Sequence, residues 1–154
     1  MKLFREILFP VDFSEVTPKI VPWVSTIAEQ FGAKIHLLFV VRKLEHFSEI
    51  DVAPVVIQDF EAAVIRGAEK NMEEFANTHL KEKLAYKTEV VLGDAAEEII
   101  NYIKAEGIDL VIMGTHGRKG LNRILFGSVA DRVIKISPVP VLSINPYRVV
   151  ELEK

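Results

Sequence analysis

Short apolar runs alternate with longer segments of helical period along this chain, and no other feature limits its possible folds as strongly. The runs with strand character cover residues 6–11, 33–41, 85–92, 108–113 and 139–144. The segments with helical period cover residues 14–31, 59–80, 95–106 and 128–136. Strands that alternate with helices predict an α/β fold, in which helices cover both faces of a mostly parallel sheet.

Capping signals mark the ends of several of these helices. Asp94 is an N-cap residue with Glu97 at the capping-box offset, and Thr17 is the expected N-cap of a helix with Pro18 in its first turn. Gly32 and Gly107 follow the last helical residues, where a left-handed conformation ends many helices. Residues 42–58 show no clean period and are expected to form a loop.

The segment GTHGRKGLNRILFGS, from Gly114 to Ser128, follows the fourth expected strand directly. Its glycines let backbone N–H groups approach a bound anion, and its Gly127-Ser128 end leads into a helix whose N-terminus favours negative charge. It carries three basic residues, and no acidic residue occurs between Gly114 and Ala130. The segment therefore predicts a phosphate-binding loop.

Asp12 follows the first strand, as this loop follows the fourth. Ligands of open parallel sheets bind beyond the carboxyl ends of the strands, at the point where the strand order reverses. If the first and fourth strands are neighbours, Asp12 and the loop therefore face one crevice. These residues also have purely structural interpretations. Asp12 could cap the first helix, Ser128 with Asp131 could form a capping box, and His116 could be a surface residue.

Other phosphate motifs are missing from the sequence. A Walker A loop needs Gly-Lys followed by Ser or Thr, and the dinucleotide fingerprint needs glycines after the first strand, where this chain has PVDFSE. Both P-loop hydrolysis and NAD binding are therefore disfavoured. His36, His46 and His79 are scattered and make no metal-ligand set with a carboxylate.

Composition limits the remaining classes of function. The 154 residues fit a single domain, 1–154, and the 49% of hydrophobic residues can fill a core. A formal net charge of -3 argues against general binding to nucleic acids or anionic membranes. The chain has no cysteine and no apolar run near the ~18 residues of a membrane span. We expect a soluble, cytoplasmic protein.

The glycine pattern resembles that of the ATP-binding members of the universal stress protein family. These carry Gly, two residues, Gly, nine residues, Gly and then Ser or Thr, which here are Gly114, Gly117, Gly127 and Ser128. The opening ILFPVDFSE and the closing PVPVLSI are also similar to the family's first and last strands. The resemblance implies a five-stranded parallel sheet in the order 3-2-1-4-5, a Rossmann-like arrangement in which the first and fourth strands are neighbours.

The resemblance also implies roles for single positions. Pro10 and Asp12 would flank adenine and ribose, and Val40 would line the adenine pocket. The phosphates would be surrounded by Met113, Gly114, Gly117, Gly127, Ser128 and Val129. The sequence departs from the family pattern after Val40, where VRKLEHF lacks an acidic residue that often follows that strand.

Three functions follow as hypotheses. The first is a stress-response regulatory protein that binds ATP together with Mg²⁺ or Mn²⁺. The second is a weak ATP hydrolase or nucleotide-transferring enzyme, for which no nucleophile and base pair is evident beside the loop. The third is a partner-binding module without nucleotide, which the intact glycine motif disfavours.

The last strand also predicts an assembly. Residues Val139 to Ile144 are apolar and contain Pro140, which belongs at a sheet edge because it has no N–H to donate. An exposed apolar edge invites pairing with another chain, so we expect a two-fold homodimer through this strand. The alternative is a monomer whose edge is covered by the tail YRVVELEK.

Overall fold

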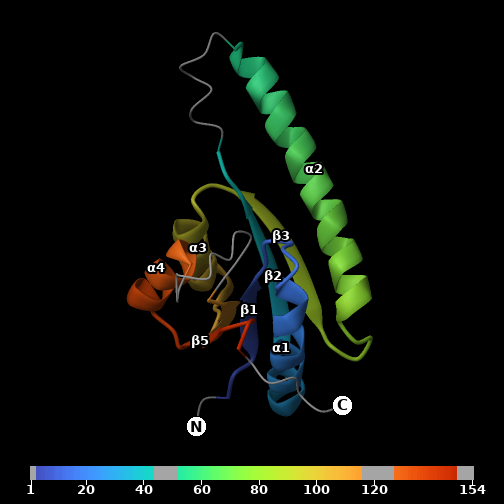
Figure 1. The fold of residues 1–154 in the computed structure, drawn as a ribbon, viewed down its shortest axis with the longest axis vertical. Coiled ribbons are helices and arrows are strands. Elements are labelled where there is room, and N and C mark those ends of the chain that lie inside the picture. The colour runs from blue at the N-terminus through green and yellow to red at the C-terminus, as the bar shows by residue number, and fades with distance from the viewer. Residues whose placement is uncertain (1–2, 44–51, 116–126, 149–154) are drawn as a thin grey trace.

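The computed structural model describes residues 3–43, 52–115 and 127–148. Strands and helices alternate along the chain (Figure 1). They are β1 (Glu6–Pro10), α1 (Thr17–Phe31), β2 (Lys34–Val41), α2 (Pro54–His79), β3 (Tyr86–Leu92), α3 (Ala95–Glu106), β4 (Leu110–Gly114), α4 (Ser128–Ile136) and β5 (Val141–Ile144). The strands form one parallel sheet in the order β3-β2-β1-β4-β5, which confirms the predicted α/β class and strand order.

Helices cover both faces of this sheet, because successive residues of a strand point to opposite faces. Ile7 and Phe9 of β1 pack into a core with α1 and α2. Leu8, between them, packs into a second core with α3 and α4. The two cores explain why the central strands are continuous apolar runs. Figure 1 shows α1 and α2 on one side of the sheet and α3 and α4 on the other.

Most of the predicted helix ends agree with the structure. Asp94 is the N-cap of α3 and accepts a hydrogen bond from the Glu97 N–H at 3.0 Å. Gly32 and Gly107 adopt left-handed conformations with φ of 61° and 64° directly after α1 and α3. Helix α4 has the bounds that the sequence predicted.

Several predicted boundaries were wrong, and three of the differences have a clear physical reason. Thr17 is the first residue of α1 rather than its N-cap, because its hydroxyl donates to Asp12 at 2.8 Å. Helix α2 begins at Pro54 rather than Asp59, since proline suits the first helical position, so residues 54–58 are not loop. Strand β5 begins at Val141 rather than Val139, because Ser137 Oγ bonds both the N–H and the carbonyl of Val139.

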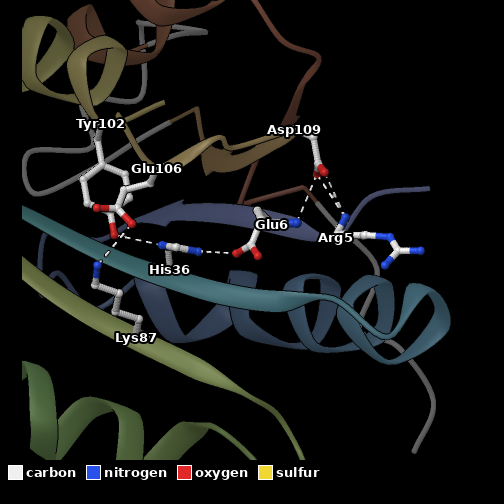
Figure 2. A network of polar contacts seen from close by, with 7 residues as sticks. All are labelled: Arg5, Glu6, His36, Lys87, Tyr102, Glu106 and Asp109. Carbon is white, nitrogen blue, oxygen red and sulfur yellow. Dashed lines mark hydrogen bonds and ion pairs between the residues drawn. The ribbon is translucent and has the colours of Figure 1, made fainter. Parts of the chain in front are cut away.

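Asp109 fixes the amino-terminal end of β1 beside β4. Its carboxylate accepts hydrogen bonds from the N–H of Arg5 at 3.0 and 3.1 Å and from the N–H of Glu6 at 3.2 Å (Figure 2). Its own N–H donates to the Glu6 carbonyl at 3.0 Å. The side chain is buried, so these bonds are shielded from water. These bonds hold β1 against β4, a neighbouring strand that lies far from β1 in the sequence.

A second polar group links β1, β2 and α3 at the same end of the sheet. The buried His36 bonds Glu6 through Nε2 at 2.5 Å and the Tyr102 hydroxyl through Nδ1 at 2.8 Å (Figure 2). Burial, and after it the charge of Glu106, raises the pKa of Tyr102 above its ordinary value. The phenol therefore keeps its proton and can donate to Nδ1 while Nε2–H donates to Glu6. Both ring nitrogens of this buried histidine thus have partners.

We predict that Asp109→Ala lowers the free energy of unfolding by about 1.5–3 kcal/mol, the size of hydrogen bonds to a charged group. The substitution leaves the N–H groups of Arg5 and Glu6 without their acceptor. Urea denaturation measures the change. The control is Asp131→Ala, which removes only an exposed pair with Lys135 and should cost well under ~1 kcal/mol. Equal stability of the two variants would contradict the role given to Asp109.

Candidate functional site

The predicted site residues gather at the carboxyl ends of three neighbouring strands. Pro10 ends β1, with Asp12 two residues beyond, Val40 lies near the end of β2, and Met113 and Gly114 end β4. Strand β1 pairs with both β2 and β4, so these ends lie side by side. Gly127, Ser128 and Val129 stand at the start of α4. Gly117, His116 and the three basic residues of the loop lie outside the described residues.

The apolar members of this set share one face of the sheet. Val40, Met113 and Val129 all belong to the core beneath α3 and α4. Pro10 follows Phe9, whose side chain enters the opposite core, so the alternation of the strand places Pro10 on the α3 and α4 side as well. Pro10 and Val40 are half-buried, so each keeps accessible surface at the sheet edge. Together they form an apolar floor beside Asp12.

The carboxylate of Asp12 is held through one of its two oxygens. Oδ1 accepts from the Ser14 N–H at 3.0 Å and from the Thr17 hydroxyl at 2.8 Å. These are the hydrogen bonds that the described residues make to this side chain, and neither uses Oδ2. The expected capping role was wrong, because the N-cap of α1 is Val16 and the helix has no side-chain cap; Asp12 instead orders the turn before α1. Its second oxygen is left to accept a bond from a ligand hydroxyl or to bind a cation.

The two ends of the glycine-rich loop are tied together by backbone hydrogen bonds. The Thr115 N–H donates to the Ile144 carbonyl at 2.8 Å, and the Gly127 N–H donates to the Thr115 carbonyl. A Cβ at position 127 would lie 3.3 Å from that carbonyl oxygen, which is a tight contact. Glycine at 127 therefore has a packing reason that is independent of any ligand.

Helix α4 begins without a side-chain cap. Gly127 is its N-cap, with extended backbone at φ -61° and ψ 153°, and Asp131 N–H makes the first helical bond, to the Gly127 carbonyl at 3.0 Å. The capping box predicted for Ser128 and Asp131 was wrong, because Ser128 is already inside the helix and Asp131 instead pairs with Lys135. Within the described part of the chain, the first N–H groups of α4 have no side-chain acceptor, a state that suits an anion.

Arg132 gave no signal in the sequence. Arg132 of α4 donates to both oxygens of Asp94, at 2.9 and 3.1 Å, and so joins the starts of α3 and α4. The Glu97 N–H, and after it Arg132, holds the pKa of Asp94 below its usual value. This contact fixes the position of α4, and therefore of its N-terminus, relative to α3.

Phe13 anchors the Asp12 loop on the opposite face. Its φ is 57°, a left-handed conformation that is strained for an aromatic residue. Its ring lies 4.6 Å from the Phe39 ring of β2 and 6.4 Å from the Phe75 ring of α2, measured between centroids. The loop thus places Phe13 against the core beneath α1 and α2, while Asp12 bonds Ser14 and Thr17. Sequence analysis missed this residue because its role depends on contacts with distant elements.

A shallow hollow of about 280 Å³ also lies on the Phe13 side. Its lining residues are Phe13, Ser14, Pro18, Asn71, Glu74, Phe75, Thr78 and His79. None of the predicted site residues lines it, although Phe13 and Ser14 directly follow Asp12 in the sequence. Among the residues that the structure describes, no three His, Asp or Glu side chains gather in a way that could hold a metal ion.

We predict that Phe13→Ala is less stable than Phe13→Gly. Both variants lose the ring contacts, each of which contributes about 0.5–1.5 kcal/mol beyond its burial. Alanine keeps the left-handed strain at this position, whereas glycine adopts it freely. Thermal and urea denaturation of both variants measure the order. An alanine variant that is as stable as the glycine variant would show that Phe13 is not held in a strained conformation.

No helix in the described ranges is long and apolar enough to cross a membrane. The fold itself is shared with known proteins. Residues 3–145 match the family model described as the universal stress protein family. Universal stress protein MJ0531 of Methanocaldococcus jannaschii is 34% identical over 150 residues, which cover 93% of this chain and 83% of that protein.

Universal stress protein MJ0577 of the same organism is 30% identical over 163 residues, covering 93% of this chain and 96% of that protein. Its solved structure matches with a TM-score of 0.81 and 28% identity, over 94% of this chain and 97% of the other. A universal stress protein in complex with cAMP shares the fold at 19% identity and a TM-score of 0.62, over 94% and 99% of the two chains.

The universal stress protein of Archaeoglobus fulgidus in complex with dAMP shares the fold at 15% identity and a TM-score of 0.63, over 92% and 98% of the two chains. At these identities both complexes show a likeness of fold alone. The family match and the relatives from Methanocaldococcus jannaschii span most of the sequence. The chain belongs to the universal stress protein family.

Proposed function

We propose that this chain is a stress-response regulatory protein that binds ATP at the carboxyl edge of the sheet, with the phosphates over the Gly114–Ser128 loop. One observation carries the proposal. Asp12 and the uncapped N-terminus of α4 follow the ends of β1 and β4, which are adjacent strands where the sheet order reverses. Nucleotides bind at such switch points in open parallel sheets.

The adenine side of the proposed site is apolar. Pro10 and Val40 lie on one face at the ends of neighbouring strands and keep accessible surface for a purine ring, while Met113 on the same face is buried. Small-molecule sites are commonly lined in this way, with a few polar groups that set orientation. The two complexes of this fold with cAMP and dAMP contain an adenine nucleotide, which supports the same ligand class here.

The phosphate side would be formed by backbone groups. The N–H groups of Ser128 and Val129 open α4 and precede its first internal hydrogen bond. An anion at a helix N-terminus gains about 0.3–1 kcal/mol from the helix dipole, and several N–H hydrogen bonds add more. Gly114 and Gly127 border the loop, and Gly117 lies within it, so a phosphate can approach this backbone closely.

The free oxygen of Asp12 would accept a hydrogen bond from the ribose or bind a divalent cation. In nucleotide sites Mg²⁺ is held by one or two carboxylates together with the phosphates. Asp12 fits this pattern, because among the described residues Ser14 and Thr17 bond Oδ1 and none bonds Oδ2. A bound Mg²⁺ or Mn²⁺ would neutralise charge on the phosphates, and Asp12 would be the protein ligand that orients it.

Further parts of the proposal concern assembly and location. Strand β5 pairs only with β4 in the sheet, and Leu142 on it is exposed, so it offers an edge for a two-fold homodimer. We further propose that residues 1–154 act as one domain in the cytoplasm, without nucleic-acid or membrane partners, in line with the net charge of -3.

We predict that Asp12→Asn weakens ATP binding by about 1.5–3 kcal/mol, the size of hydrogen bonds to a charged group. That is roughly ten- to a hundredfold in Kd. Asparagine keeps an Oδ1 acceptor for Ser14 and Thr17, so the loop should persist while the charge is lost. Titration calorimetry with Mg²⁺ and ATP measures the effect.

The matched control for this measurement is Thr17→Val. It removes the hydroxyl bond to Asp12 but leaves the carboxylate charged, and valine fills the same buried volume. We expect it to bind ATP within about threefold of wild type, since only one neutral donor is lost. If Asp12→Asn and Thr17→Val bind ATP alike, Asp12 has a structural role only.

We also predict that the purified protein releases ATP on denaturation, as detected by mass spectrometry, and turns it over at well below ~1 per second. A regulatory protein needs to hold its nucleotide, whereas an enzyme needs an activated base. Released ADP with steady multiple turnover at ~1 per second or more would move the chain to the hydrolase class. An empty site that also fails to take up added ATP would favour a partner-binding module.

A further inference from the structure

The amino-terminal half of α2 is less buried than the rest of the helix in the described structure, where Ile57, Val64 and Ile65 are only half-buried. The buried residues of this helix are Ala68, Met72, Phe75 and Ala76, all in its second half. From Pro54 to Gly67 no residue is buried. Figure 1 shows this half of α2 running on past the carboxyl edge of the sheet. The helix is about 39 Å long at 1.5 Å per residue, and its first half packs only partly against the rest of the described chain.

Large apolar side chains gather on this half of the helix. Val55, Val56 and Phe60 are 60%, 54% and 57% exposed. A helix segment without a packed face is marginal in water, because most helical stability in proteins comes from the burial of an apolar face. Exposed apolar groups of this size, in a cluster, are typical of an interaction surface.

The exposed residues form a continuous stripe with a distinct shape. Val56, Phe60, Ala63 and Gly67 follow one another at spacings of four, three and four, so they lie along one face of α2, and all are exposed. Two large side chains thus stand at the amino-terminal end of the stripe, and two small ones follow. We name these residues the α2 stripe.

The α2 stripe is complementary to itself when two copies meet antiparallel. In such a pair about a two-fold axis, residue i contacts residue j and residue j contacts residue i. With the axis beside Ala63, Phe60 stands opposite Gly67 of the partner subunit, where the missing side chain leaves room for the ring. A parallel pair would instead place the Phe60 rings of the two copies against each other.

The charges beside the stripe favour the same arrangement. Asp59, Arg66 and Lys70 lie along one flank of it, at spacings of seven and four. In the antiparallel pair this flank meets the same flank of the other helix, so Asp59 falls between Arg66 and Lys70 of the partner subunit. In a parallel two-fold pair this flank would instead meet the opposite flank of the other helix, so these charges would not face one another. Opposite charges beside an apolar seam set the orientation of paired helices.

We propose that the α2 stripe is an interface between two copies of this chain, formed by antiparallel pairing of their α2 helices. The interface is separate from the proposed β5 dimer, because α2 packs on β2 and β3 while β5 forms the other edge of the sheet. Two isologous interfaces at opposite edges link the subunits into assemblies larger than a dimer. The proposal does not depend on nucleotide binding.

Disulfide trapping tests the interface directly, because the chain has no cysteine of its own. Ala63→Cys puts a thiol beside the two-fold axis, close to the same thiol of the partner subunit. Gln58→Cys is the control, an exposed position on the same half of α2 but off the stripe. Under mild oxidation at micromolar concentration, Ala63→Cys should form covalent dimers at least tenfold faster than Gln58→Cys. The same result is expected in a Val141→Lys background, which disrupts the proposed β5 pairing.

Charge exchange supplies a second test, read by analytical ultracentrifugation in the Val141→Lys background. Asp59→Lys should raise the dimer Kd at least tenfold, and adding Arg66→Asp and Lys70→Glu should restore it. Glu69→Lys, at an exposed position away from the stripe, should leave the dimer Kd within about threefold of its value before the substitution. Cysteine variants that crosslink equally slowly would overturn the proposal. So would a monomer in which residues 44–51 of the same chain, or a different protein, cover the stripe.

Discussion

The parallel pairing of β1 with β4 is the contact on which the rest of this structure depends. It joins strands that are far apart in the sequence and makes the point at which the sheet order reverses. Asp109 holds it at the amino-terminal end, where its buried carboxylate accepts from two backbone N–H groups of the β1 start. Because paired parallel strands keep their register, this contact at the amino-terminal end also helps to place the carboxyl ends of β1 and β4 side by side.

The loop after β1 connects the core of the sheet to the proposed nucleotide site. Phe13 is held in a left-handed conformation and fixed by aromatic contacts with β2 and α2. Its neighbour Asp12 is tied to Ser14 and Thr17 at the start of α1. A similar division holds at α4, where Arg132 binds the cap of α3 while the helix N-terminus stays open. In both places a contact within the protein orders the chain, while a neighbouring polar group stays available to the proposed ligand.

The sequence predicted those features that depend on local signals. Helix α4, the Asp94 cap and the glycine ends at 32 and 107 follow from residues within one turn, and all are confirmed. The α/β class followed from the alternation of periods, while the strand order came from the family resemblance, because composition does not specify which strands pair. The cap at Thr17 failed because Asp12, five residues away, takes its hydroxyl. The strain at Phe13 and the pairing of His36 with Glu6 arise only once distant elements meet, so no local pattern contained them.

The central claim is that an adenine nucleotide lies over the ends of β1, β2 and β4, and amide NMR spectra recorded during an ATP titration test it most directly. The account predicts that ATP with Mg²⁺ shifts the amide signals of Asp12, Val40, Ser128 and Val129. The signals of Phe75 and Ala76, in the core of the opposite face, should stay in place. Saturating ATP that leaves the first group unmoved, or that acts mainly on the α1 and α2 face, would contradict the account.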